Sequence, residues 1–209
     1  KIIEEMNIEE WQDSDFYQPR FNIAPSQYSP VIIDKVVRHA KLMRWGLIPN
    51  WATDFSIGSK LINARSETLL QKPSFQNLVP SRRCVVISDG YFEWRTIGNK
   101  KIPYFVYESE KKIIPLAGLC KWDIDRAGQK QLVYTIITKE ARGELCNIHH
   151  REPLMLNNKG LQSWLDNSNQ IDKPTVFLDN ALQDIAYKQV SQYVNSVKNN
   201  DRSCIEYIK

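Results

Sequence analysis

The sequence is poor in residues that cross-link or bend a protein chain. Its 209 residues include 8 glycines and 4 cysteines. The cysteines, Cys84, Cys120, Cys146 and Cys204, form no CxxC pair. This spacing argues against a zinc ribbon and against a dense disulfide framework. We therefore expect no metal site and a reducing, intracellular compartment, cytoplasmic in a bacterium and nuclear in a eukaryote.

Long apolar runs and a large charge of one sign are also missing. Apolar runs such as Cys84–Ile87 are far too short to span a bilayer. No basic-then-apolar leader follows Lys1, so we expect neither a signal peptide nor a membrane partner. The net charge is only +4. Such a balance is compatible with a nucleic-acid partner but does not require one.

Aromatic and apolar residues, in contrast, are plentiful. The chain has 6 Trp, 9 Tyr and 7 Phe, and 42% of its residues are hydrophobic. That composition excludes wholesale disorder and is sufficient for a core. We see no repeat or linker, so residues 1–209 are expected to form one domain.

Short β-branched and aromatic runs dominate the middle of the chain and are typical of strands. Turn residues such as Ser88–Gly90 separate them. Strands are predicted at 31–33, 36–37, 42–47, 83–87, 91–94, 104–107, 116–120 and 132–137, and helices at 1–18, 63–71, 159–166 and 179–188. The predicted fold class is α+β, a curled, largely antiparallel and barrel-like sheet with short flanking helices.

Three segments carry residues suited to chemistry. Asn63–Glu67 combines an amide, a guanidinium and a carboxylate, which suits a phosphate clamp or, alternatively, an ordinary helix start. Glu93 lies in the aromatic run Gly90–Trp94, where burial would make it an acid or base, and an exposed strand position is the alternative. His149 can be a catalytic imidazole or a structural one. His149 and His150 lack further metal ligands nearby.

Basic and aromatic residues surround these segments. The tryptophans Trp45, Trp51, Trp94 and Trp122 are able to stack on unpaired bases, although each is equally suited to a core. The arginines near the same segments are Arg44, Arg65, Arg82, Arg83 and Arg95. Because the net charge is small, any phosphate-binding surface must be local.

Ten short segments, taken together, follow a recognisable order: Asn22–Pro25, Arg44–Pro49 with Trp51, Asn63–Thr68, Arg82–Cys84, Gly90–Trp94, Pro103–Tyr104, Ala117–Leu119, Thr135 with Thr138, Ile148–Pro153 and Val190–Asn195. This series resembles the SRAP (SOS-response-associated peptidase) family of abasic-site processing proteins. The resemblance covers residues 19–197, nearly the whole chain.

The resemblance implies an abasic-site sensor that binds single-stranded DNA and needs no cofactor. SRAP proteins remove their own initiator Met and expose an N-terminal cysteine. Its amine forms an imine with the ring-opened aldehyde of the abasic site, and its thiolate then closes a thiazolidine, a covalent DNA–protein crosslink. Replication-fork proteins are left open as further partners. Two alternatives are a non-covalent single-stranded DNA binding module and a peptidase acting in trans.

The resemblance also assigns roles to residues of this chain. Glu93 is expected to act as acid and base, His149 to transfer protons at the sugar, and Asn63 to position the cysteine or the sugar. Arg65 is expected to bind the phosphate beside the lesion. The other expected DNA-binding residues are Arg44, Arg82, Arg83, Trp45, Trp51, Trp94, Asn22 and Pro25.

The sequence departs from the family pattern at two places. Glu152 stands where the family usually has Met, and a carboxylate there is expected to weaken DNA binding or shift a pKa. The family begins Met-Cys-Gly-Arg, whereas this sequence begins at Lys1. None of the four cysteines matches the N-terminal one in position. We expect the segment with the reactive cysteine to precede Lys1.

Overall fold

A computed structural model describes residues 1–48, 61–110, 112–124, 127–168, 171, 181–182 and 184–207. The strands are β1 (Glu10–Trp11), β2 (Tyr28–Ile33), β3 (His39–Trp45), β4 (Asn63–Arg65), β5 (Arg83–Ser88), β6 (Tyr91–Ile97), β7 (Lys100–Glu108), β8 (Ile114–Ile124), β9 (Lys130–Glu140), β10 (Arg151–Pro153) and β11 (Ile185–Gln189). The α-helices are α1 (Ile2–Glu5) and α2 (Asn158–Leu165), and the 3₁₀ helices are η1 (Ser14–Phe16), η3 (Ser66–Thr68), η4 (Gly143–Asn147), η6 (Gln192–Asn195) and η7 (Arg202–Cys204).

Five of the strands close into a barrel. β3, β2, β5, β8 and β9 pair in that order, and β9 pairs with β3 to complete the ring. The Tyr134 hydroxyl of β9 lies 2.6 Å from the Ser29 hydroxyl of β2, a strand with which β9 does not pair. Side chains alternate between the two faces of each strand, so half of them point into the barrel. Ser29 and Tyr134 both point inward, and their contact crosses the barrel interior. The predicted barrel-like α+β fold is confirmed.

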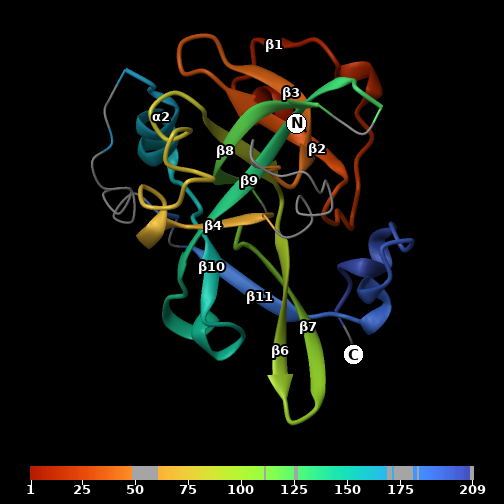
Figure 1. The fold of residues 1–209 in the computed structure, drawn as a ribbon. Helices are drawn as coiled ribbons and strands as arrows, with labels where there is room; N and C mark the ends of the chain where they lie inside the picture. Colours follow the sequence, from red (N-terminus) through yellow and green to blue (C-terminus); the bar gives the residue numbers. More distant parts are fainter. Residues whose placement is uncertain are drawn as a thin grey trace.

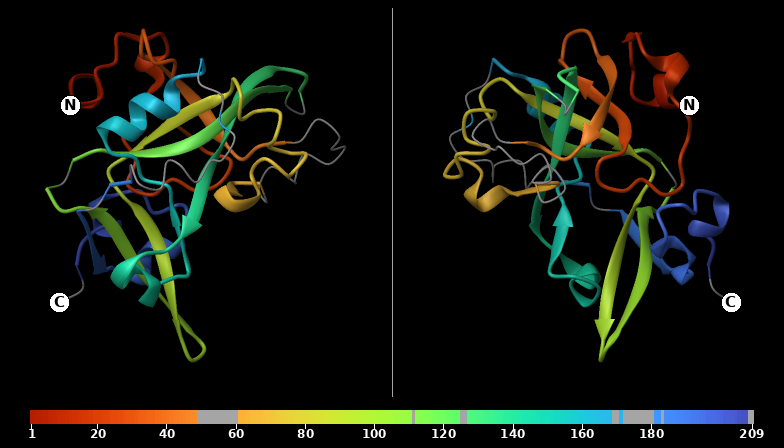
Figure 2. Two further views of the ribbon diagram at one scale, coloured as in Figure 1. Left: turned by 90° about the vertical axis from the view of Figure 1, so that its left-hand side faces the viewer. Right: turned by 45° about the vertical axis from the view of Figure 1, so that its right-hand side comes forward.

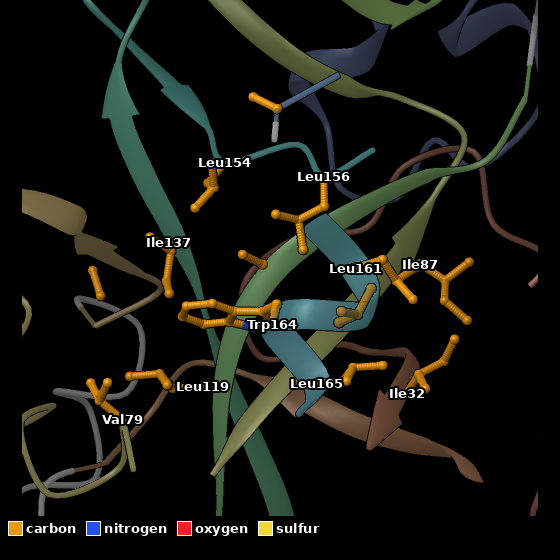
Figure 3. Close-up of a cluster of buried hydrophobic side chains, with 14 of the residues drawn as sticks. Ile32, Val79, Ile87, Leu119, Ile137, Leu154, Leu156, Leu161, Trp164 and Leu165 are labelled. Atoms are coloured by element: carbon orange, nitrogen blue, oxygen red, sulfur yellow. The ribbon is translucent and has the colours of Figure 1, made fainter. Parts of the chain in front are cut away.

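Two apolar layers lie on the two faces of the barrel strands. The interior layer includes Val31, Met43 and Cys84. The outer layer packs under α2, whose Trp164 is fully buried with Leu119 and Ile137 in the same cluster (Figure 3). Burying a side chain of this size stabilises a fold by several kcal/mol. The barrel therefore has a continuous core on both sides of its wall.

Strand β9 organises the rest of the eight-stranded sheet. It pairs antiparallel with β8 and β10 and parallel with β3 and β4. Thr138 pairs with both Arg65 of β4 and Pro153 of β10, so these two strands flank β9 on opposite sides. Segments that are far apart in the sequence are thus brought together at one end of the barrel.

A smaller sheet projects from that end of the barrel. Its three antiparallel strands are ordered β11-β7-β6, and the β6–β7 hairpin extends away from the barrel (Figures 1 and 2). Gly98 takes φ +57° at the hairpin turn, a conformation that glycine adopts without steric cost. β6 is an edge strand of this sheet, so one side of its backbone is not paired within the sheet.

Most strand predictions are confirmed, and α2 confirms the helix expected at 159–166, with the Asn157 side chain accepting from the Gly160 N–H as its cap. The pair expected around Asp34 is wrong in part. Asp34 takes φ 79°, and residues 35–37 form a bend before β3. The helix expected at 1–18 ends at Glu5, because Asn7 takes φ 48° and turns the chain toward β1.

Two further helix predictions are wrong. The segment expected as a helix at 63–71 begins with β4, which pairs with β9, and continues as η3. The described part of 179–188 contains the start of β11, which pairs with β7 from Ile185 onward. In both places, hydrogen bonds to a distant strand override local helix propensity.

Candidate functional site

Glu93 and His149 meet where the small sheet approaches the end of the barrel. Glu93 Oε2 lies 3.6 Å from His149 Nδ1. Glu93 is carried by the edge strand β6, and His149 lies between η4 and β10. Both side chains are partly exposed, at 26% and 36%. Both side chains are therefore accessible to a ligand, and they are close enough to interact with each other.

The backbone holds this pair in place. Glu93 Oε1 accepts a hydrogen bond from the Trp94 N–H at 3.1 Å. His149 Nδ1 lies 3.1 Å from the Arg151 carbonyl oxygen and 3.2 Å from the Arg151 N–H. These contacts fix the imidazole, while its other nitrogen, Nε2, is not used in them.

Burial changes the acidity of Glu93. Loss of solvation is the main cause and raises the pKa of the Glu93 carboxyl, while the charge of His149 and the Trp94 N–H oppose the shift. A carboxyl with a raised pKa retains its proton closer to neutral pH. Such a group can donate a proton and take it back, as general acid–base catalysis requires.

The pair lies in an open groove of about 490 Å³. The groove is lined by Glu93, Trp94, Thr96, Lys101, His149 and Asn195. The Trp94 indole N–H donates to Asn195 Oδ1 at 2.8 Å, which joins β6 to η6 and fixes the ring. The predicted site residues Glu93, His149 and Trp94 are therefore brought together, and Thr96, Lys101 and Asn195 join them.

Arg151 is a further residue of this region, and no role of its own was predicted for it from the sequence. Its guanidinium donates to both carboxylate oxygens of Glu67, at 2.8 and 2.9 Å, and to the Thr138 carbonyl at 2.8 Å. The hydrogen bond to Arg151 is the main cause that lowers the pKa of Glu67. The signal was present, since Arg151 follows His149 by two residues and Glu67 follows Asn63 by four.

Asn63 and Arg65 lie on β4, next to β9. Both side chains are exposed, and Arg65 pairs in register with Thr138, the residue that holds Arg151. Glu67 of the adjoining η3 is bonded to Arg151 directly. The Asn63–Glu67 segment therefore lies beside Arg151, which follows His149 by two residues. Asn63 and Arg65 do not line the groove itself.

Arg44 and Trp45 lie on β3, where it pairs with β9, and have different surroundings. Trp45 stacks on Tyr134 with ring centroids 6.4 Å apart, and its indole N–H donates to the Ile62 carbonyl. Arg44 donates to the Ser26 hydroxyl at 2.8 Å. Trp51 falls outside the described residues.

Two predicted DNA-binding residues are structural instead. Arg83 is 1% exposed and donates to the backbone carbonyls of Val79, Pro80, Trp164 and Asp166. The assignment of Arg83 to a DNA-binding surface is therefore wrong, because its guanidinium is inside the protein.

Asn22 is likewise buried, and its amide donates to the carbonyls of Val194, Ser196 and Asn199. It anchors the segment after β11 and does not line the groove, which corrects its expected place in the pocket. Pro25 and Arg82 are exposed but are not among the groove residues either.

Glu152 does not point toward solvent. Its side chain is 1% exposed and contacts the Lys139 ammonium and Nε of Arg142, the latter at 3.1 Å. Lys139 and Arg142 balance its charge inside the protein. Of the two expected effects of Glu152, the shift of a pKa is confirmed, because with Glu93 it adds to the effect of burial in raising the pKa of Tyr91.

Among the described residues, no group of three or more His, Cys, Asp or Glu side chains is arranged to hold a metal ion. Cys84, Cys120 and Cys204 are buried thiols and Cys146 is exposed. No helix in the described ranges has the length and apolar character needed to cross a membrane.

The fold and the site define a member of one family. Residues 1–197 match the SOS response associated peptidase (SRAP) family, and the chain belongs to it. Among similar proteins, the abasic site processing protein YoqW of Bacillus subtilis is 38% identical over 98% of this chain and 93% of its own length. The abasic site processing protein HMCES of Gallus gallus is 31% identical over 94% of this chain and 68% of its own length.

Solved structures share the fold. A protein from Bacteroides thetaiotaomicron aligns with a TM-score of 0.76 and 26% identity, over 88% of this chain and 82% of its own. A protein from Bordetella bronchiseptica aligns with a TM-score of 0.73 and 20% identity, over 91% and 94% of the two chains. The barrel with its projecting three-stranded sheet is thus a shared architecture.

Proposed function

We propose that this protein processes abasic sites in single-stranded DNA by forming a covalent crosslink, with Glu93 and His149 moving the protons. The observation that carries the proposal is the Glu93–His149 pair, 3.6 Å apart at one end of an open groove. The names of the relatives, abasic site processing proteins, support the substrate.

The chemistry begins with the closed sugar of the abasic site. Opening it breaks the bond between C1′ and the ring oxygen, which gains a proton while the C1′ hydroxyl loses one. A protonated Glu93 can supply the first proton, and a carboxyl with a raised pKa keeps that proton available. His149, beside it, can accept the second. The product is a free aldehyde.

The aldehyde then reacts with the family's nucleophile. We place that nucleophile, the cysteine of a Met-Cys start exposed by self-removal of the Met, ahead of Lys1. Its amine adds to C1′ and water leaves, which gives an imine. Its thiol then adds across the C=N bond, the sulfur to carbon and the proton to nitrogen, and closes the thiazolidine.

Binding is assigned to residues around the groove. Trp94 offers a fixed aromatic face for an unpaired base. Arg65, exposed on β4, suits the phosphate beside the lesion, and Asn63 on the same strand suits the sugar or the cysteine. Arg151, held by Glu67, presents a second guanidinium near His149.

The test uses the protein expressed from its natural start codon. It is incubated with single-stranded DNA that contains one abasic site, and adducts that resist denaturation are measured over time. We expect an adduct, slowed by Glu93→Gln and by His149→Ala and unchanged by Glu144→Gln, an exposed carboxylate bonded to Tyr187. Absence of an adduct, or salt-sensitive binding that ignores the lesion, would contradict the proposal.

The self-processing step has its own measurement. Mass spectrometry of the purified protein gives the residue at its N-terminus. We expect Cys without the preceding Met, and an accumulation of the Met-bearing form in the Glu93→Gln variant. Complete removal of Met in every variant would show that this site does not carry out the cleavage.

A further inference from the structure

The groove extends well beyond the Glu93–His149 pair. Thr96 of β6 and Lys101 of β7 face one another in the register of the hairpin, and both line the groove. Three residues of extended strand separate Thr96 from Glu93, which corresponds to about 10 Å. This end of the groove therefore lies outside the reach of the sugar that reacts at Glu93.

Side-chain direction groups Thr96 and Lys101 with Trp94. Residues two apart on a strand share a face, so Trp94 and Thr96 point the same way, and Lys101 opposite Thr96 joins them. Lys100, opposite Ile97, points to the other face and does not line the groove. The hairpin thus presents an indole, a hydroxyl and an ammonium on one face. Glu93 points to the other face, and the groove includes residues of both faces along the edge strand β6.

Lys101 makes no ion pair among the residues that the structure describes. Its side chain is exposed, and none of their carboxylates lies within 4.0 Å of its ammonium. Other lysines are engaged: Lys139 contacts Glu152, and Lys188 lies over the rings of Phe105 and Tyr107. Proteins that bind single-stranded nucleic acids combine positive charge, which binds the backbone, with aromatic rings on which the bases stack.

We propose that the Thr96–Lys101 end of the groove is a binding subsite for the nucleotide next to the abasic site, with its phosphate on Lys101 and its base against Trp94. The proposal rests on the proposed function, since it requires a DNA strand in the groove. The Thr96 hydroxyl donates to the same phosphate. The protein thereby binds the nucleotide next to the abasic site as well as the sugar of the abasic site itself.

Salt dependence isolates the phosphate contact. The test measures equilibrium binding of a single-stranded oligonucleotide that contains a stable abasic analogue, at several salt concentrations. Each phosphate neutralised on a single strand contributes about 0.7 to the slope of log K against log salt. We expect Lys101→Gln to reduce the magnitude of the slope by about 0.7, and Lys101→Arg to retain it. The matched control, Lys100→Gln, leaves the slope unchanged.

Truncated oligonucleotides locate the phosphate. One ends directly 5′ of the analogue and the other directly 3′ of it, so each lacks the neighbouring nucleotides on one side. We expect the effect of Lys101→Gln to disappear with one of the two and to persist with the other. Crosslinking at saturating DNA with a natural abasic site proceeds at the normal rate in the control Lys100→Gln, because Lys100 does not line the groove.

Three results would contradict the proposed subsite. The slope of log K against log salt could be unchanged in Lys101→Gln, or it could change equally in Lys100→Gln. The effect of Lys101→Gln on binding could also persist with both truncated oligonucleotides. Binding of an acidic peptide, in place of DNA, with the same dependence on Lys101 would assign the groove to a different ligand. Failure of the unaltered protein to form any adduct would instead contradict the proposed function, so the two ideas fail separately.

Discussion

The two sheets of this protein differ in how deeply their strands β9 and β6 are buried. In β9 of the large sheet, every residue from Val133 to Lys139 is buried, whereas β6 of the small sheet has no buried residue. The large sheet is therefore a scaffold held by its core, and β6, the edge strand of the small sheet, carries side chains that remain accessible. The site lies where they meet, with Glu93 from the small sheet and His149 beside the large one.

This division explains how a partly exposed pair can be positioned well. Catalytic groups need supporting elements that do not move, and a buried barrel wall provides them. The Arg151 backbone that holds His149 belongs to β10, which pairs with β9. The contrast predicts that changes of accessible side chains on β6 alter chemistry at constant stability, and that changes in the buried core of the large sheet do the opposite.

The largest expected effect separates chemistry from stability. Glu93→Gln keeps the shape of the side chain and removes its acid–base function, so the crosslinking rate should fall about 10²- to 10⁴-fold. Single-turnover kinetics with abasic DNA measure the rate, and urea unfolding checks that the free energy of unfolding is not reduced. A variant that lost stability along with activity would remove the distinction between the sheets.

The converse change lies in the core between α2 and the large sheet. Trp164→Ala removes a fully buried indole and the hydrogen bond that it donates to the Cys84 carbonyl. We expect a loss of about 3–5 kcal/mol in the free energy of unfolding. Urea denaturation measures this loss, and the crosslinking rate per folded molecule should stay the same.

The buried charge cluster gives a sharper test within the large sheet. Lys139→Met leaves Glu152 buried with only Arg142 to balance it and should cost about 3 kcal/mol. The double variant Lys139→Met, Glu152→Met replaces the buried pair by apolar side chains and should recover most of that loss. Equilibrium unfolding of both variants checks this. Equal stability of the single and double variants would mean that the ion pair is not the reason for the loss.

The smallest expected effect is a difference between Glu93 and Glu67 in how each makes the free energy of unfolding depend on pH. Glu93 has a raised pKa, so the stability that it contributes is complete below the unfolded value of about 4.3 and is lost as pH rises through its folded pKa. Relative to the unaltered protein, Glu93→Gln should therefore become more stable as pH rises from about 4 toward neutral.

Glu67 should behave in the opposite way. Arg151 lowers its pKa, so its contribution is present above about 4.3 and is lost as pH falls through the folded pKa. Glu67→Gln should match the unaltered protein in acid and be less stable at neutral pH, by a small amount because the carboxylate is 42% exposed. Unfolding curves between pH 3 and pH 8 measure both differences. The same sign for both variants would contradict this explanation.

Much of the barrel could be predicted from local sequence, because its strands are β-branched or aromatic runs separated by turns. The segments 63–71 and 179–188 could not, since β4 and β11 form by pairing with β9 and β7, far away in the sequence. Glu93 and His149 were predictable as candidates. Their 3.6 Å separation depends on how two sheets meet, which no local pattern contains.

Arg83 and Arg65 illustrate the same limit at single residues. Both are arginines near predicted strands, and the sequence suggested DNA binding for each. Arg65 is exposed, whereas Arg83 donates to carbonyls of Trp164 and Asp166, more than 80 residues later. The packing of α2 and of the Val79–Pro80 segment around Arg83 distinguishes the buried cation from the surface one.

The pairing of β9 has a consequence for insertions and deletions in this family. Trp45 is aligned to Tyr134, and both Arg65 and Pro153 are aligned to Thr138. One residue added between Tyr134 and Thr138 would shift these partners relative to each other and turn the following side chains to the opposite face. Loops such as the 98–99 turn can vary in length at small cost. We therefore expect lineages of this fold to differ in loop length while the spacing along β9 stays constant.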